Sequence, residues 1–146
     1  MMHDRKWVLA ERKTDEGLSL IRIMELDASF AFQRYPERLN VIWAYRDTGP
    51  DDTPAEEEQD AMGRFESRIC EYIEATEQAL LCVVFTEPGY REFVFYSSTV
   101  ESFLEALSEI PQEESGPYPI QIHHESDSKG EFYKSYAKKL LAQRFG

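Results

Sequence analysis

The sequence predicts an α+β fold of the ferredoxin-like split βαβ type, in which two helices cover one face of an antiparallel sheet. From Leu39 onward, segments with the patterns of strands and helices follow in the order β-α-β-β-α-β. A β-rich hairpin precedes this unit, and an amphipathic helix follows it. We therefore expect one domain over residues 1–146, with a hairpin extension (1–34), a ferredoxin-like core (35–126) and a C-terminal helix (127–146).

The N-terminal part of the chain contains two runs rich in β-forming residues. They cover residues 7–12 and 18–26, and the sequence KTDEG between them ends in a turn-forming glycine. In the second run both alternating faces contain apolar residues, so we expect a strand that is partly covered on both sides. A third strand, with one strongly apolar face, is predicted over residues 39–45.

A long amphipathic helix is predicted after this third strand. Thr53 can cap its first turn, Pro54 suits the first helical position, and Glu56 can close a capping box. Apolar residues then recur at three- and four-residue spacing over about five turns, which indicates one buried stripe. The residues of this stripe are Met62, Phe65, Ile69, Tyr72, Ile73 and Thr76.

The remaining elements complete the predicted order. The continuous apolar run ALLCVVFT indicates a strand buried on both faces, and residues 91–97 return beside it after the turn EPGY. A second capping box at residues 98–101 begins a short helix, and residues 118–125 form the last strand. Asp127 is expected to cap the final helix. That helix should bury Phe132, Tyr136 and Leu140 and expose Lys134, Lys138 and Lys139.

The acidic side chains are unevenly distributed along the chain. The formal net charge is −12, and residues 47–127 carry twenty Asp and Glu against three Arg. Such a block repels phosphate backbones and attracts basic surfaces. Part of this excess of acidic residues is explained by their favourable interaction with the start of a helix and by their effect on solubility. The residues predicted to contact a basic partner are Asp51, Asp52, Glu56, Glu57, Glu58 and Asp60.

A stretch that covers the end of the turn EPGY and most of the fifth predicted strand resembles half of an RNA-binding octamer. Residues 89–96 read GYREFVFY, which fits the ending F-V-x-F/Y of that pattern. The first four positions do not fit, because Arg91 stands where a stacking aromatic belongs and Glu92 is acidic. Single-strand binders also need a positive groove. We therefore expect no nucleic-acid binding, and we interpret the aromatic residues as parts of a packed strand.

The motifs of catalysis and cofactor binding are missing from the sequence. His123 and His124 are adjacent on a predicted strand and therefore point to opposite faces. Cys70 and Cys82 lack the paired spacing of a zinc site. There is no nucleophile elbow and no phosphate-binding glycine loop. We expect no metal, no cofactor and no enzymatic activity.

The cellular location follows from the same composition. No apolar run approaches the roughly 20 residues that a membrane-spanning helix needs. The N-terminus MMHDRKWVLAERK lacks the pattern of a signal peptide. Two cysteines form no disulfide framework and suit a reducing compartment. We expect a cytoplasmic protein without membrane contact.

Three segments together resemble a known family. They read YPERLNVIWAY, LLCVVFTEPGYREFVFYSS and PYPIQIHHESD, the last followed by a helix containing tyrosine. Over residues 35–141 the chain is similar to the domain-of-unknown-function family numbered 695. Domains of this kind look similar to regulators of ribonuclease E activity, which are small acidic proteins that inhibit by binding. The resemblance also implies a role like that of the small acidic cytoplasmic proteins that serve as immunity partners of secreted bacterial toxins.

These observations favour a non-catalytic binding protein that docks an acidic surface on a basic nuclease or toxin and inhibits it. Two alternatives stay open. One is a small-molecule-binding or catalytic domain with its site on the open sheet face or against the final helix. The other is a structural domain that forms a homodimer through that same sheet face.

Overall fold

The structure is a computed structural model that describes residues 6–45, 48 and 53–145. Six strands and three helices follow one another, with a short 3-10 helix, Phe32–Arg34, between β2 and β3. Among the described residues, none of the helices has the length and apolar character needed to cross a membrane. In chain order the elements are β1 (Trp7–Thr14), β2 (Gly17–Met24), β3 (Glu37–Ala44), α1 (Glu56–Thr76), β4 (Ala79–Glu87), β5 (Tyr90–Ser97), α2 (Val100–Glu109), β6 (Ile120–Ser126) and α3 (Glu131–Phe145).

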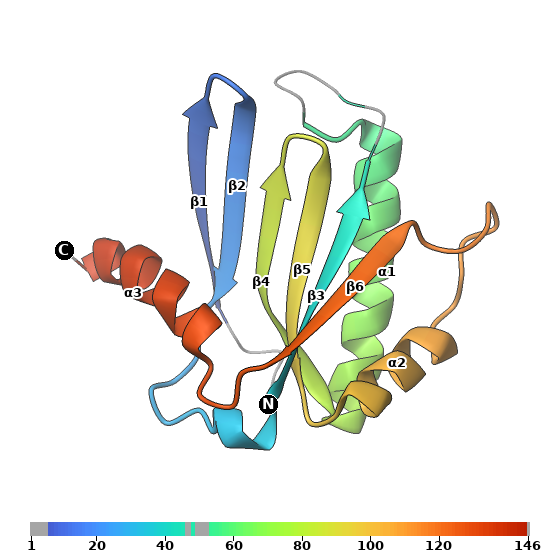
Figure 1. The fold of residues 1–146 in the computed structure, drawn as a ribbon. Helices are drawn as coiled ribbons and strands as arrows, with labels where there is room; N and C mark the ends of the chain where they lie inside the picture. Colours follow the sequence, from blue (N-terminus) through green and yellow to red (C-terminus); the bar gives the residue numbers. More distant parts are fainter. Residues whose placement is uncertain (1–5, 46–47, 49–52, 146) are drawn as a thin grey trace.

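The six strands form one antiparallel sheet in the order β1-β2-β4-β5-β3-β6 (Figure 1). The α+β class predicted from the sequence is therefore confirmed. The N-terminal hairpin joins the main sheet, because residues 20–23 of β2 pair with residues 83–86 of β4. β1 and β6 are the two edges of the sheet.

The helices α1 and α2 pack on one face of the sheet (Figure 1). The predicted stripe of α1 is largely correct, since Met62, Phe65, Ile69 and Ile73 are its buried residues. Thr76 is an exception, because it is exposed at the end of the helix. Burying a large apolar side chain of this kind contributes about 1.5–3 kcal/mol, so this stripe holds α1 on the sheet.

Both predicted capping boxes need correction. The first helix begins at Glu56 with Ala55 at the N-cap, and no side chain caps it. Pro54 instead lies before the helix, in a bridge with Thr48. In α2 the cap is Thr99 rather than Ser98, and its hydroxyl accepts a hydrogen bond from the Ser102 amide at 3.0 Å. Ser98 and Thr99 are both of residue types that favour the N-cap position, so the sequence pattern could not decide between them.

The helix α3 covers part of the opposite face, over a second group of buried residues that includes Phe85 and Tyr96. Asp127 caps it as predicted, accepting hydrogen bonds from the Glu131 and Phe132 amides at 2.8 and 3.1 Å. The residues predicted to be buried, Phe132, Tyr136 and Leu140, are only partly buried. The most buried side chain of α3 is Tyr133, at 4% exposure.

Tyr133 can be buried because its hydroxyl has two backbone partners, one at the end of β2 and one just after it. It donates to the Met24 carbonyl at 2.6 Å and accepts from the Leu26 amide at 3.0 Å. A buried tyrosine needs such partners for its hydroxyl. These bonds fix α3 against the hairpin, which leaves the upper part of this sheet face open in Figure 1.

Candidate functional site

The predicted contact residues lie around the beginning of α1, and the structure describes four of the six. Glu56, Glu57 and Asp60 are exposed there, as a contact surface requires. Asp51 and Asp52 lie outside the described residues. The first-turn carboxylates also stabilise the helix, because they stand near the positive end of its dipole.

Glu58, the fourth described residue, has a structural role. The indole Nε1 of Trp43 donates a hydrogen bond to Glu58 Oε2 at 3.0 Å, and Trp43 is only 2% exposed. Its ring packs beside Phe65 and Tyr118, with ring centroids 5.9 Å away in both cases. A buried indole N–H left without an acceptor is costly. Glu58 therefore ties α1 to β3 and is a poor candidate for a partner contact.

The negative surface continues beyond the predicted residues, along the solvent side of both helices that cover this face. The carboxylates on α1 recur at helical spacing and so share one stripe, and those on α2 are four residues apart. We call this surface the acidic helix face. It consists of Glu56, Glu57, Asp60, Glu71, Glu74, Glu101, Glu105 and Glu109, all of which are exposed.

Two arginines, Arg64 and Arg68, are the basic residues of these two helices, and both pair with the single carboxylate of Glu113, which offsets one of their two charges. Glu113 accepts hydrogen bonds from Arg64 Nη2 at 2.6 Å and from Arg68 Nη1 at 2.7 Å. The bond from Arg64, and then that from Arg68, lowers the pKa of Glu113 to about 2. Arg68 also donates to the Tyr118 hydroxyl at 2.8 Å. These guanidinium groups therefore do little to offset the acidic helix face.

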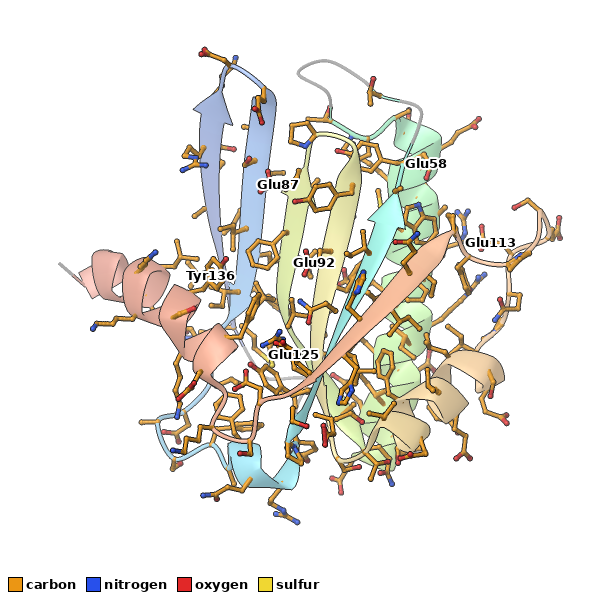
Figure 2. All side chains as sticks on the ribbon, in the orientation of Figure 1. Glu58, Glu87, Glu92, Glu113, Glu125 and Tyr136 are labelled. Atoms are coloured by element: carbon orange, nitrogen blue, oxygen red, sulfur yellow. The ribbon has the colours of Figure 1, made fainter. Side chains whose placement is uncertain are left out.

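A hollow of about 400 Å³ lies at the upper end of this face, between α1 and the loop before β6. Its lining combines carboxylates with aromatic rings, a combination that suits a cationic side chain. Figure 2 labels Glu58 and Glu113 on its two sides. The polar and aromatic lining residues are Trp43, Glu57, Glu58, Asp60, Arg64, Glu113 and Tyr118.

A larger groove, of about 680 Å³, lies on the other face of the sheet, between α3 and the upper ends of β1, β2, β4 and β5. We call it the α3 groove. Figure 2 labels Glu87, Glu92 and Tyr136 among its lining residues. The sequence analysis missed Glu87 and Glu92. The alternation of β5, which puts Tyr90 and Glu92 on one face, could have indicated Glu92, whereas no local pattern indicates Glu87 at the end of β4.

The histidine and cysteine residues are dispersed. His123 pairs with Asn40 and His124 with Leu39, so the two imidazoles point to opposite faces. His124 Nε2 lies 2.7 Å from Glu37 Oε1. Burial raises the pKa of the Cys70 thiol to about 12. In the part of the chain that the structure describes, no three His, Cys, Asp or Glu side chains are grouped to hold a metal ion.

The fold and these two concave regions define an α+β protein with an acidic helical layer on one face of its sheet and a mixed groove on the other. The chain belongs to the family described as "Family of unknown function (DUF695)", whose model matches residues 5–137. This match confirms the resemblance seen in the sequence. No curated protein and no solved structure matches the chain.

Proposed function

We propose that this protein is a non-catalytic binding module that docks its acidic helix face on a basic protein, such as a nuclease or toxin, and inhibits it. The observation that carries the proposal is the imbalance of charge on α1 and α2. Arg64 and Arg68 are the only basic residues of α1 and α2 and both pair with Glu113, whereas the acidic helix face carries eight exposed carboxylates.

The distribution of charge over the molecule supports directional docking. The basic residues Lys134, Lys138 and Lys139 are exposed on α3, on the opposite side of the sheet. A basic partner is therefore attracted to one side and repelled from the other. Complementary fields of this kind raise association rates by about 10- to 1,000-fold at low salt. They also suppress docking in the wrong orientation.

The spacing of the carboxylates suits a protein site that normally holds nucleic acid. Glu101, Glu105 and Glu109 are one helical turn apart, which is about 6 Å along the axis of α2. A regular row of negative charges resembles a phosphate backbone, and a basic nucleic-acid site is built to bind such a row. Inhibition would follow from occupation of that site.

Two finer assignments accompany this proposal. We propose that β3, α1, β4, β5, α2 and β6 form a ferredoxin-like split βαβ unit, which the strand order β6-β3-β5-β4 within the sheet supports. We also propose a cytoplasmic location, because Cys70 and Cys82 are free thiols and such thiols suit a reducing compartment.

The test uses two variants with the same change in net charge. Glu57→Lys/Asp60→Lys reverses two charges of the acidic helix face and leaves the Trp43–Glu58 bond in place. Glu11→Lys/Asp15→Lys reverses two exposed charges on the N-terminal hairpin. Tagged wild-type protein is used to capture partners from native lysate at low and high salt, and the captured basic protein is then purified.

Affinity for the purified partner is then measured for all three proteins, with melting temperatures as a check on folding. We expect the α1 variant to lose most of its affinity and the hairpin variant to keep it. If both variants bind as tightly as the wild type, the acidic helix face is not the contact surface.

A further inference from the structure

The α3 groove has the dimensions of a small-molecule site. Its volume of about 680 Å³ falls within the 300–1,000 Å³ that is typical of ligand pockets. It lies on the face of the sheet that α1 and α2 do not cover, so it is separate from the acidic helix face and does not depend on the function proposed for that face.

The strand register arranges the groove residues in two rows across the sheet. The lower row is apolar over three strands, with Ala10 opposite Ile21 and Ile21 opposite Phe85. It ends at Glu92, which pairs with Phe85. The upper row is polar, since Arg12 pairs with Ser19 and Glu87 with Tyr90. A ligand in the groove would therefore lie on an apolar floor with charged groups at its ends.

Two carboxylates form the end of the groove at β4 and β5. Glu87 and Glu92 are diagonal neighbours on adjacent strands, a relation that puts Cα atoms about 7–8 Å apart. Ser19 Oγ donates a hydrogen bond to Glu87, and Asn40 Nδ2 donates to Glu92 Oε2 at 2.6 Å. Both carboxylates are half-buried. Among the described residues, neither of them pairs with a cationic side chain.

Neutral donors alone compensate a half-buried carboxylate incompletely. An ammonium group placed between Glu87 and Glu92 could contact both carboxylates and would offset half of their combined charge. The negative potential at this end also acts on Tyr90, which is 38% exposed. Partial burial raises the pKa of its hydroxyl, and the charges of Glu87 and Glu92 raise it further.

Two cations, on β1 and α3, line the end of the groove away from Glu87 and Glu92, together with one exposed carboxylate of β1, Glu11. Arg12 and Lys139 are both exposed, and within the described residues neither has an ion-pair partner. Arg12 stands two strands from Glu87, which corresponds to about 10 Å across the sheet. This distance suits a carboxylate at the far end of an extended ligand.

Two aromatic side chains of α3 form a wall beside the apolar floor. Tyr136 lies edge to face against Phe85 of the floor, with ring centroids 5.0 Å apart, and Phe132 packs beside Tyr136 at 5.2 Å. These rings offer apolar surface to the middle of a bound molecule. They provide no hydrogen-bond network that would favour a sugar or a nucleobase over a hydrophobic group.

We propose that the α3 groove binds a small zwitterionic ligand of the hydrophobic dipeptide class. Its ammonium group would pair with Glu87 and Glu92, its apolar side chains would rest on Ile21 and Phe85, and its carboxylate would pair with Arg12 and Lys139. Each part of this ligand meets a group of opposite charge or of like polarity in the groove.

The proposal is tested by calorimetric titration with three probes that differ only at their ends. These are the dipeptide Leu-Phe, its N-acetylated form, which lacks the ammonium group, and its C-terminal amide, which lacks the carboxylate. Titration extends to about 10 mM, a range that reaches millimolar dissociation constants. We expect Leu-Phe to bind and each blocked form to bind about tenfold more weakly, because one charge-assisted contact is lost.

Matched variants assign each end of the ligand. Glu87→Gln and Glu92→Gln should each weaken Leu-Phe about tenfold and leave the affinity of the N-acetylated form nearly unchanged. Arg12→Gln/Lys139→Gln should weaken Leu-Phe and leave the amide unchanged. The control is Glu105→Gln, on the exposed side of α2, which should bind all three probes as the wild type does.

Three results would overturn the proposal. They are the absence of saturable Leu-Phe binding, equal affinity for all three probes, or normal Leu-Phe binding by Glu87→Gln and Glu92→Gln. Melting temperatures show whether each variant is folded. Because no variant except the control touches α1 or α2, these outcomes are independent of the acidic helix face.

Discussion

Replacing Gly130 by alanine is predicted to be among the most destabilising small substitutions in this protein. Gly130 precedes α3 and has φ = +66°, in the left-handed region that L side chains rarely adopt. A Cβ atom added here would lie 2.5 Å from Phe32 Cδ1 and 2.6 Å from two further atoms of that ring. Contacts this short do not occur between real atoms, so the backbone or the ring has to move.

The ring of Phe32 has little room to move. It is 6% exposed and packs against Tyr96 and Tyr133, with centroids 5.1 and 5.7 Å away. The left-handed conformation costs a non-glycine residue about 1–2 kcal/mol, and overpacking a core costs about 1–3 kcal/mol. We therefore expect Gly130→Ala to lower the free energy of unfolding by about 2–5 kcal/mol.

A second glycine provides the matched control. Gly63 lies within α1, and an added Cβ would meet nothing within 4 Å. Alanine is favoured over glycine in a helix by about 0.5–1 kcal/mol, so Gly63→Ala should be slightly stabilising. Urea denaturation followed by circular dichroism measures both changes. A Gly130→Ala variant as stable as the wild type would refute the packing described for Phe32 and the start of α3.

Three further predictions concern single contacts. Glu58→Ala should lower stability by about 1–3 kcal/mol, because the buried Trp43 N–H loses its acceptor, whereas Glu58→Gln retains an amide oxygen and should cost clearly less in the same urea assay. Asp127→Ala should cost about 2–4 kcal/mol, because it removes the cap of α3, worth about 1 kcal/mol, and leaves the hydroxyl of the buried Tyr96 without its acceptor, which costs about 1–3 kcal/mol. The comparison is the exposed Glu125→Ala, which removes only a pairing with Arg38. The third prediction is pH-dependent, since the pKa of Glu113 is lowered to about 2. The contribution of Glu113 to stability is present above the ordinary carboxyl pKa and is lost as the pH falls toward 2. Glu113→Gln should therefore weaken the decrease of the melting temperature over this pH range. A decrease equal to that of the wild type would contradict the bridge to Arg64.

The sequence was sufficient for most of the elements, because each depended on a local pattern. The alternation in β3, the apolar run of β4 and the stripe of α1 led to segments close to those observed. The position of the N-terminal hairpin did not follow from any local pattern. Both faces of β2 are mixed, and only its pairing with β4 decides that the hairpin extends the sheet.

The candidate sites also contain features that follow from a local sequence pattern and features that depend on tertiary packing. The exposed carboxylates of α1 could be predicted from charge and helical spacing. The hydrogen bond between Trp43 and Glu58 could not, because it depends on how α1 packs on β3. The helical stripe through Phe132 and Tyr136 does not indicate Tyr133, because the burial of Tyr133 depends on carbonyl and amide groups more than 100 positions away in the sequence. The α3 groove needs the register of four strands, which no local pattern contains.

The central claim is that the acidic helix face guides the protein to a basic partner. The most direct test is the association rate constant for the purified partner, measured as a function of ionic strength for the wild type, Glu57→Lys/Asp60→Lys and Glu11→Lys/Asp15→Lys. Rim charges act mainly on this rate constant and on its salt dependence. The account predicts a steep decrease with salt for the wild type and the hairpin variant, and a slower association with a clearly weaker salt dependence for the α1 variant. The same steep decrease in all three proteins would contradict it.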